Sequence, residues 1–536
     1  MDAGVKIRMA MRSGTKYLAM WSGTKYLAMW TGVFILMTSS AFAADDLTVK
    51  TMAGRVQGTS LNRGAVNAFL GIPYAAPPVG NLRWRAPEPA ARWKGVRDAT
   101  KFGAGCAQSN VYGDMSFHAT DFSEDCLFLN VYAPDNSVRA HNLPVMVWIH
   151  GGGYVAGASS EPRHNGDMLP INGVVLVTFN YRLGVLGFLA ASPLSREQGG
   201  SAGNYGLMDM VAALHWVRQN IAEFGGDPGN VTIFGESAGS YAVSTLMASP
   251  MAQGLFHKAI GQSGGAFGGV LPIDPFAERQ KSDDAWVAAL KVDSLTELRA
   301  LPTDKLLAAA KDWKKGFGVT IDGKLLPESV EATYAAGKQA HVPLLAGWMR
   351  DEGAFFAQTM TVQSYKKWAT AKFNDRAAEF LAVYPGLTDE QATRSFLDFG
   401  GDSFIAFGSW KWIEAHSKTG QSPVYRYFWE LAAPPCPAHP KASAFHSDDI
   451  EYVFGTLDTR KGTTWRDQDR LLSDQVMGYW TNFARTGDPN GPGLSKWPLF
   501  SADGTVLHLG KSITASPDAL RTRYEFLLKG IPKFKE

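Results

Sequence analysis

Three serines in this 536-residue chain lie in the pattern Gly-x-Ser-x-Gly: Ser201 in GGSAG, Ser237 in GESAG and Ser263 in GQSGG. The pattern is typical of a nucleophilic serine that attacks a carbonyl group from a sharp turn between a strand and a helix. Because the chain contains 56 glycines, the pattern alone does not select one serine. The neighbouring elements have to decide which serine, if any, is the nucleophile.

Only Ser237 has the required neighbours on both sides. The apolar run NVTIF before GESAG predicts a buried strand, and the run after it is compatible with a helix. Ser201 follows a polar loop, and Ser263 runs into GGAFGG, which is too rich in glycine to begin a stable helix. We therefore predict that Ser237 is the nucleophile, with glycines on either side where a Cβ would collide.

A second motif, HGGG at residues 150–153, follows directly on the apolar run LPVMVWI. Glycines leave backbone N–H groups free to face a carbonyl oxygen and to stabilise the negative charge that develops on it. Alone, this motif would fit a flexible turn equally well. At the end of a predicted strand and together with GESAG, it predicts an oxyanion hole.

A serine nucleophile needs a histidine to accept its proton and an acid to orient that histidine, in the chain order serine, acid, histidine. His439 and His446 both follow the predicted strand 424–431, and spacing favours His446 without excluding His439. Asp351 and Glu352 both follow the apolar run VPLLAGW. Catalytic residues of open α/β sheets gather at such strand ends, so the residues alone leave both acids open.

The remaining chain alternates between apolar runs and helical patterns. Near-continuous apolar runs are typical of strands buried on both faces of a parallel sheet. We predict one α/β domain over residues 44–536, with a large, mostly parallel sheet flanked by helices. The strands are expected at 143–150, 174–181, 231–234 and 342–348, and the helices at 206–224 and 467–484.

Residues 1–43 read as a secretory signal peptide. Five basic residues precede the apolar run LAMWTGVFILM, and a small-x-small cleavage site, Ala-Phe-Ala, ends the segment. We therefore expect a secreted or periplasmic protein. Removing this segment takes away five Lys/Arg and one Asp, which changes the formal net charge from +2 to −2. A near-neutral chain gives no electrostatic reason to expect nucleic acid or anionic membrane as a partner.

Taken together, the motifs resemble the type-B carboxylesterases of the α/β-hydrolase superfamily, which include para-nitrobenzyl-type esterases and cholinesterases. The resemblance covers essentially all of residues 47–525 and implies an α/β-hydrolase fold with insertions that form an active-site gorge. The motifs that carry it are FLGIPYAAPPVGNLRWRAPEP, SEDCLFLNVYAP, HGGGYVAG, the segment from GNYGLMDM to GESAGS, MRDEGAFF and FHSDDIEYVFG.

The resemblance assigns the catalytic groups. It implies Ser237 as nucleophile, Glu352 as triad acid and His446 as general base, and so favours Glu352 over Asp351 and His446 over His439. The implied oxyanion donors are the backbone N–H groups of Gly152, Gly153 and Ala238. It also implies a supporting hydrogen-bonded pair, Ser263 and Asp449. Phe355 and Phe356 are expected to line the substrate pocket, to which we also assign Tyr154 and Glu236.

The three cysteines of the chain outside the signal segment are Cys106, Cys126 and Cys436. Cys106 and Cys126 bracket a polar loop, and a bridge there would stabilise the fold by about 3 kcal/mol, although two buried thiols are an alternative. The resemblance implies the disulfide. We expect Cys436 to be free.

The expected reaction is hydrolysis of a small-molecule carboxylic ester through an acyl-enzyme, with activity rising with pH through roughly 6–7. Cleavage of amides or carbamates and a non-catalytic binding protein are the alternatives. Cholinesterases carry a tryptophan in the loop between the paired cysteines, and this tryptophan stacks on a quaternary ammonium. The loop here contains Tyr112, Phe117 and Phe122 but no tryptophan, so the resemblance does not imply a choline ester as the substrate. We expect no cofactor, no metal and no stable membrane anchor, and we favour a monomer. A metal site at His439, His446, Asp448 and Asp449 would lack ligand spacing on a rigid element.

Overall fold

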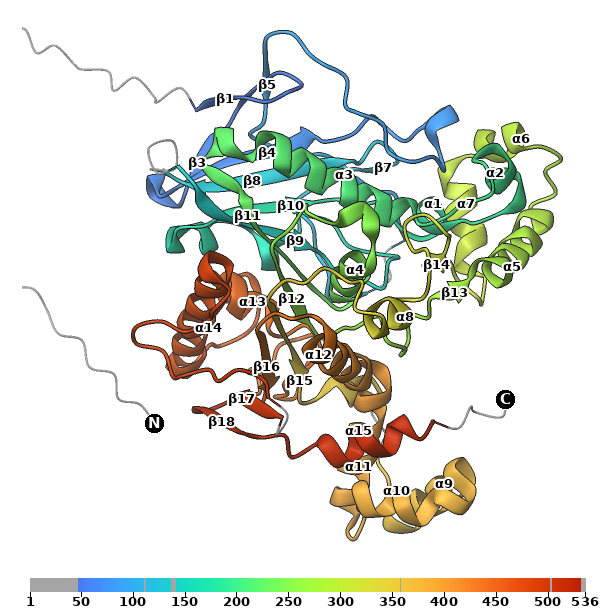
Figure 1. Ribbon diagram of the computed structural model, residues 1–536, viewed down its shortest axis with the longest axis vertical. Helices are drawn as coiled ribbons and strands as arrows, with labels where there is room; N and C mark the ends of the chain where they lie inside the picture. Colours follow the sequence, from blue (N-terminus) through green and yellow to red (C-terminus); the bar gives the residue numbers. More distant parts are fainter. Residues whose placement is uncertain (1–46, 110–111, 136–140, 357, 502–503, 532–536) are drawn as a thin grey trace, which may run out of the picture. The chain divides into compact units, whose positions relative to one another are not determined.

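The predicted apolar strands form the centre of one 11-stranded sheet with the order β18-β17-β16-β15-β12-β11-β9-β10-β8-β4-β3 (Figure 1). All neighbouring strands from β17 to β10 in this order run parallel. At one edge β18 pairs antiparallel with β17, and at the other edge β8, β4 and β3 pair antiparallel with their neighbours. This confirms the predicted fold class. The strands are β3 (Thr59–Leu61), β4 (Val66–Pro73), β8 (Phe128–Pro134), β9 (Leu143–Ile149), β10 (Val175–Phe179), β11 (Gly226–Glu236), β12 (Lys258–Gln262), β15 (Leu344–Met349), β16 (Val424–Trp429), β17 (Thr505–Leu509) and β18 (Ile513–Pro517).

This computed structural model describes residues 47–109, 112–135, 141–356, 358–501 and 504–531. The chain divides into residues 1–46 and 47–536, so the predicted signal peptide lies outside the described residues. Small sheets complete the strands: β1 (Thr48–Lys50), β2 (Arg55–Gln57) and β5 (Val96–Asp98); β6 (Gly105–Cys106) and β7 (Phe122–Ser123); β13 (Asp274–Pro275) and β14 (Thr320–Ile321).

The central sheet separates two hydrophobic cores, which explains why its strands are apolar along their whole length. In β9, Val145 and Val147 face one core, while Met146 and Trp148 face the other. Because successive side chains of a strand point to opposite faces, a strand buried on both faces needs apolar residues at every position.

Helices cover both faces of the sheet. In Figure 1, α13 and α14 lie on one side of the central strands, and α4, α8 and α12 lie on the other. The predicted helices are confirmed as α3, followed by a 3-10 turn, and α14. The helices are α1 (Gly184–Phe188), α2 (Ser192–Glu197), α3 (Tyr205–Asn220), α4 (Ala238–Ala248), α5 (Phe276–Ala289), α6 (Leu295–Ala300), α7 (Thr303–Lys311), α8 (Val330–Ala335), α9 (Val362–Phe373), α10 (Ala377–Val383), α11 (Asp389–Gly401), α12 (Phe407–Thr419), α13 (Ile450–Phe454), α14 (Asp467–Thr486) and α15 (Arg521–Leu528).

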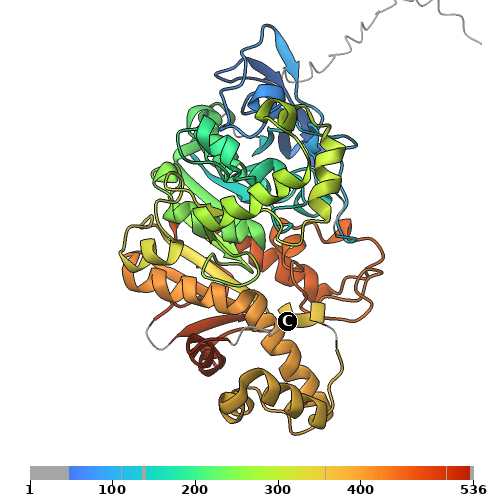
Figure 2. The same cartoon turned by 90° about the vertical axis from the view of Figure 1, so that its right-hand side faces the viewer.

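Helices α9, α10 and α11 form a small bundle at one end of the molecule, drawn in gold and orange in Figure 2. Aromatic rings fill its centre: Trp368 lies edge-on to Phe380, Phe396 and Phe399. The bundle follows Glu352 in the chain and leads back towards the sheet through α12.

The carboxyl ends of the parallel strands meet at one edge of the sheet. GESAG ends β11, HGGG follows its neighbour β9, and GQSGG ends its other neighbour β12. Glu352 follows β15, and His446 lies in the segment after β16. The topology therefore brings all the predicted catalytic segments to this edge.

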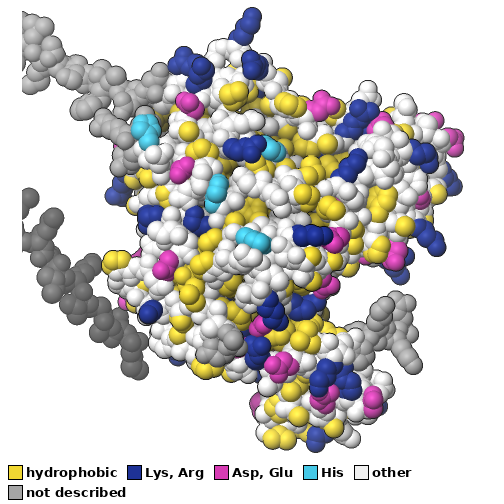
Figure 3. All heavy atoms as spheres, viewed as in Figure 1, with side chains coloured by type: hydrophobic (Ala, Val, Ile, Leu, Met, Phe, Trp, Pro, Cys, Tyr) yellow, Lys and Arg dark blue, Asp and Glu magenta, His cyan; other side chains and the backbone are white. Residues whose placement is uncertain are grey.

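On the face drawn in Figure 3, Lys and Arg side chains are interspersed with Asp and Glu. None of the helices in the described ranges is both long enough and apolar enough for a bilayer crossing.

Candidate active site

Ser237 lies at the sharp turn between β11 and α4. Its backbone has φ 53° and ψ −122°, a conformation rare for a residue with a side chain, at a cost on the order of 1–3 kcal/mol. The glycines of GESAG are required sterically. A methyl group at Gly235 would lie 2.6 Å from the carbonyl oxygen of Ile149, and one at Gly239 would lie 2.0 Å from the same atom. Ser201, in contrast, lies in a loop.

The HGGG segment lies directly against this turn. A methyl group at Gly151 would lie 3.1 Å from Cβ of Ser237. Gly152 and Gly153 have φ values of 101° and 62°, and a methyl group at Gly152 would lie 2.2 Å from the carbonyl oxygen of Ala156. Because α4 begins at Ala238, the predicted oxyanion donors come from two backbone segments that meet at the serine.

His446 is in direct contact with Glu352. Nδ1 of His446 lies 2.6 Å from Oε2 of Glu352, and both side chains are buried. Oε1 of Glu352 accepts a hydrogen bond from the N–H of Met349 at 3.0 Å, which fixes the carboxylate at the end of β15. A carboxylate on Nδ1 sets the orientation of the imidazole and leaves Nε2 for other partners.

Asp351 does not contact His446 but anchors the segment that carries it. Its carboxylate accepts the N–H of Ala444 at 2.8 Å, and its own N–H donates to the carbonyl of Ala444 at 3.0 Å. Burial alone would raise the pKa of Asp351, but Arg350 and Arg394 outweigh it and hold that pKa below its usual value. The two adjacent acids therefore have separate tasks.

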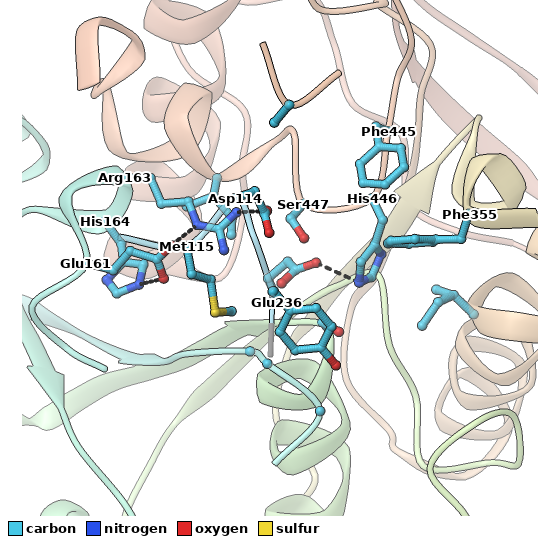
Figure 4. Close-up of a pocket in the computed structure, with 18 of the residues that line it drawn as sticks. Asp114, Met115, Glu161, Arg163, His164, Glu236, Phe355, Phe445, His446 and Ser447 are labelled. Carbon is cyan, nitrogen blue, oxygen red and sulfur yellow. Dashed lines mark hydrogen bonds and ion pairs between the residues drawn. The ribbon is translucent and has the colours of Figure 1, made fainter. Parts of the chain in front are cut away.

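Ser237 and His446 line one cavity of about 780 Å³ (Figure 4), within the range of small-molecule sites. The Gly151–Gly153 segment forms part of its wall. The aromatic lining consists of Tyr112, Trp148, Tyr241, Phe355, Phe404 and Phe445, and the ionisable lining includes Asp114, Glu161, Arg163, His164, Glu236 and His439. No group of three or more His, Cys, Asp or Glu side chains suited to a metal ion occurs within the described ranges.

The second imidazole nitrogen of His446 faces Glu236. Nε2 lies 3.2 Å from Oε1 of Glu236, and Figure 4 shows this ion pair beside the cavity. In the described residues no hydrogen bond joins Ser237 to His446; such bonds commonly tighten only when substrate binds. Burial opposes the charged imidazole, yet Glu236 and Glu352 together raise the pKa of His446 to about 9. Burial raises the pKa of Glu236 to about 7.

The predicted hydrogen bond between Ser263 and Asp449 is not made. Asp449 instead accepts from Gln262 at 3.0 Å and from Tyr427 at 3.2 Å, and the hydroxyl of Ser263 has no partner in the described structure. Ser263 shares the φ of 53° seen at Ser237, and a methyl group at Gly264 would lie 2.5 Å from the carbonyl oxygen of Ser237. The turn after β12 therefore packs against the turn that carries Ser237.

The four residues predicted to line the substrate pocket lie in different places. Glu236 and Phe355 line the large cavity. Phe356 does not, although it follows Phe355 in the same short 3-10 helix; its side chain is 45% exposed. Tyr154 lines a smaller neighbouring cavity. His439 lines the large cavity but contacts Phe445, at 4.1 Å between rings, rather than a catalytic group.

Cys106 and Cys126 form the predicted disulfide, with their Cα atoms 4.9 Å apart, and Cys436 is a buried free thiol. The disulfide closes a loop from which Tyr112, Asp114 and Met115 line the cavity. The bridge therefore restrains one wall of the candidate site.

Sequence reasoning missed Arg163, which contacts this same loop. Its guanidinium lies 3.5 Å from Asp114 and 2.7 Å from Glu161 (Figure 4). No local pattern marks such a residue, since its importance depends on Asp114, which lies far from it in the chain. The same is true of Asp351 and Ala444.

The chain is similar to known proteins over most of its length. Residues 45–527 match the family model described as the carboxylesterase family. Para-nitrobenzyl esterase of Bacillus subtilis is 36% identical over 509 residues, covering 90% of this chain and 99% of its own. Fumonisin B1 esterase of Sphingopyxis macrogoltabida is 36% identical over 478 residues, covering 86% of each chain. Cocaine esterase of Homo sapiens is 36% identical over 531 residues, covering 90% of this chain and 91% of its own.

Solved structures agree as well. A PNB esterase structure superposes with a TM-score of 0.77 at 34% identity, covering 89% of this chain and 99% of that one. A thermophilic PNB esterase superposes with a TM-score of 0.77 at 35% identity, covering 90% of this chain and 100% of that one.

Proposed function

Because the chain belongs to the carboxylesterase family and is a carboxylic ester hydrolase, we propose that it cleaves small-molecule esters with the triad Ser237, Glu352 and His446. The observation that carries this proposal is that Ser237 and the Glu352-bound His446 line the same cavity. No other serine of a Gly-x-Ser-x-Gly pattern in the described residues lines that cavity.

In the first step, Oγ of Ser237 attacks the ester carbonyl carbon and its proton passes to Nε2 of His446. The carbonyl oxygen becomes negative and accepts hydrogen bonds from the N–H groups of Gly152, Gly153 and Ala238. The tetrahedral intermediate then collapses. The bond to the alcohol oxygen breaks, His446 returns its proton to that oxygen, and the alcohol leaves an acyl-Ser237.

In the second step, water attacks the acyl carbon while His446 takes its proton. The bond to Oγ of Ser237 breaks, the serine recovers the proton, and the carboxylic acid leaves. Glu352 holds the imidazole through Nδ1 and stabilises its cationic form in both steps. No step requires a cofactor.

The cavity supports small, partly apolar esters as the substrate class. Its volume of about 780 Å³ and its aromatic lining suit a ligand of drug-like size. Relatives named for fumonisin B1, cocaine and para-nitrobenzyl substrates indicate that the family accepts esters of different shapes.

We also propose that the protein is exported after cleavage of residues 1–43. The disulfide between Cys106 and Cys126 supports this, because disulfides persist in oxidising compartments. N-terminal sequencing of protein recovered from a periplasmic or culture fraction should begin at Ala44. An intact N-terminus on cytoplasmic protein would contradict export.

The proposed triad is tested by steady-state hydrolysis of a simple ester by the wild type, Ser237→Ala and Ser263→Ala. We expect Ser237→Ala to lose activity by about 10⁶-fold in kcat, as expected for removal of a triad nucleophile, whereas Ser263→Ala retains most of it. Equal loss in both variants would leave the nucleophile unassigned and contradict the proposal.

A further inference from the structure

A second, smaller cavity opens beside the oxyanion loop. It has a volume of about 230 Å³ and shares Gly153, Tyr241, Val270 and Leu271 with the large cavity. The hydroxyl of Tyr241 donates to the carbonyl of Gly268 at 3.1 Å and so holds the segment that lies between the two cavities. We call this smaller cavity the side pocket.

The position of His446 indicates which part of an ester would enter the side pocket. The leaving alcohol must receive a proton from His446, so it must lie on the side of the carbonyl that faces this residue. His446 lines only the large cavity, whereas Gly153, a proposed oxyanion donor, lines both. The acyl group, on the far side of the carbonyl from the leaving alcohol, is therefore directed towards the side pocket.

The two cavities differ in charge. Asp114, Glu161 and Glu236 line the large cavity, whereas the lining of the side pocket contains no Asp or Glu among the described residues. The side pocket is lined instead by Lys314 and Lys315, which are exposed and have no ion pair within the described ranges. An anionic group in the side pocket could therefore pair with these two lysines, because no carboxylate of the described structure pairs with them.

The loop that presents the two lysines is fixed at its base. Phe317 is buried, and its ring lies edge-on to Trp286 with centroids 5.0 Å apart. Arg279, which also lines the side pocket, donates to the carbonyl of Gly316 at 2.9 Å and pairs with Asp274 at 2.5 Å. Arg279 is thus already neutralised, and the uncompensated charge of the side pocket comes from the lysines.

We propose that Lys314 and Lys315 select, through the side pocket, acyl groups that end in a carboxylate. The preferred substrates are then monoesters of short dicarboxylic acids and related polycarboxylic esters. This inference rests on the proposed triad, since it takes the direction of the acyl group from His446 and Gly153.

The test compares two esters that differ only at the acyl end: monoethyl glutarate and ethyl pentanoate. The quantity measured is the ratio of their kcat/KM values, which removes any general effect of a substitution on catalysis. The variant is the double substitution Lys314→Gln/Lys315→Gln, with Lys311→Gln as control. Lys311 is exposed at the end of α7 but does not line the side pocket.

We expect the wild type to prefer the half ester and the double lysine variant to lower the ratio roughly three- to tenfold, a size typical of two partly exposed ion pairs. Lys311→Gln should leave the ratio unchanged. Raising the salt concentration should reduce the wild-type ratio, because salt screens exposed charges.

An unchanged ratio in the double lysine variant, or an equal fall in Lys311→Gln, would overturn the proposal. A wrong assignment of the triad can be distinguished from a wrong assignment of the side pocket. If Ser237→Ala still hydrolysed ethyl pentanoate at the wild-type rate, the proposed function itself would fail. If hydrolysis depended on Ser237 but the ratio of kcat/KM values were the same in the wild type and the double lysine variant, only the assignment of the side pocket would fail.

Discussion

Nε2 of His446 lies 3.2 Å from Oε1 of Glu236, the residue immediately before Ser237. The nitrogen that we propose takes the proton of Ser237 therefore faces a carboxylate that favours keeping a proton on it. With Glu352 on the other nitrogen, the pKa of His446 rises to about 9, against burial. The proposed general base therefore keeps its proton to a higher pH than an ordinary histidine does.

The first prediction concerns the pH profile of the wild type. Because only neutral His446 can act as base, kcat/KM should rise with pH, with a midpoint above 6.5 rather than in the range of 6–7 that an ordinary histidine implies. The measurement is kcat/KM for a neutral ester between about pH 5 and 10, corrected for hydrolysis without enzyme. A midpoint at or below 6.5 would contradict the raised pKa.

Removing the charge of Glu236 should move this profile in a known direction. Glu236→Gln keeps the shape of the side chain but removes a negative charge beside Nε2, so the pKa of His446 falls and activity appears at lower pH. Comparison of the two profiles under identical conditions gives the shift. An upward shift, or none, would show that Glu236 does not hold the proton on His446.

The adjacent acids Asp351 and Glu352 should respond differently to loss of charge. Glu352→Gln should lower kcat about 10⁴-fold with little change in thermal stability, as for a triad acid whose amide favours the wrong histidine tautomer. Asp351→Asn weakens the anchor to Ala444 and should cost roughly 1–3 kcal/mol of stability, with a much smaller effect on kcat. Thermal unfolding and steady-state kinetics on both variants separate the two roles. The reverse pattern would exchange their assignments.

Gly152 should be intolerant of any side chain. Gly152→Ala places a methyl group 2.2 Å from the carbonyl of Ala156 and displaces a proposed oxyanion donor. The expected loss in kcat is about 10²–10³-fold. Gly200→Ala is the matched control, because Gly200 has a similar φ of 97° but nothing within 4 Å of an added methyl group. An equal loss of kcat in both variants would indicate backbone strain rather than loss of a donor.

The disulfide should affect substrate binding as well as stability. Replacing Cys106 and Cys126 with serine should lower stability by about 3 kcal/mol and raise KM, because the released loop carries Tyr112 and Asp114 of the cavity wall. Cys436→Ser is the control, since that thiol is free and does not line the cavity. Unchanged KM in the double variant would show that contacts such as Arg163 with Asp114 suffice to place the loop.

The sequence predicted the elements and motifs that act locally. GESAG was identifiable because a strand, a turn and a helix leave a continuous signature, and the steric need for its glycines is visible in the contacts of Gly235 and Gly239. The buried strands were predictable because a sheet covered on both faces requires apolar residues at successive positions. Spacing could not separate Asp351 from Glu352, since both follow the same strand.

The errors concern side-chain direction and long-range partners. Phe356 does not line the cavity although its neighbour Phe355 does, because consecutive residues of a 3-10 helix point in different directions. Asp449 was expected to bond Ser263, but its Oδ2 accepts from Gln262 and Tyr427, while its Oδ1 and the hydroxyl of Ser263 are both buried without a partner in the described structure. The directions of these side chains are seen only in the packed structure. The contact of Glu236 with His446, which changes the expected pH profile, has the same origin.

The most direct test of the central claim is to identify the residue that becomes covalently modified in the active enzyme. The wild type is treated with a fluorophosphonate probe, digested and mapped by peptide mass spectrometry, alongside Ser237→Ala and Ser263→Ala. The probe should be found on Ser237 alone, labelling should vanish in Ser237→Ala, and it should persist in Ser263→Ala. A probe found on Ser263 or Ser201, or labelling that survives Ser237→Ala, would contradict the assignment of Ser237 as the nucleophile.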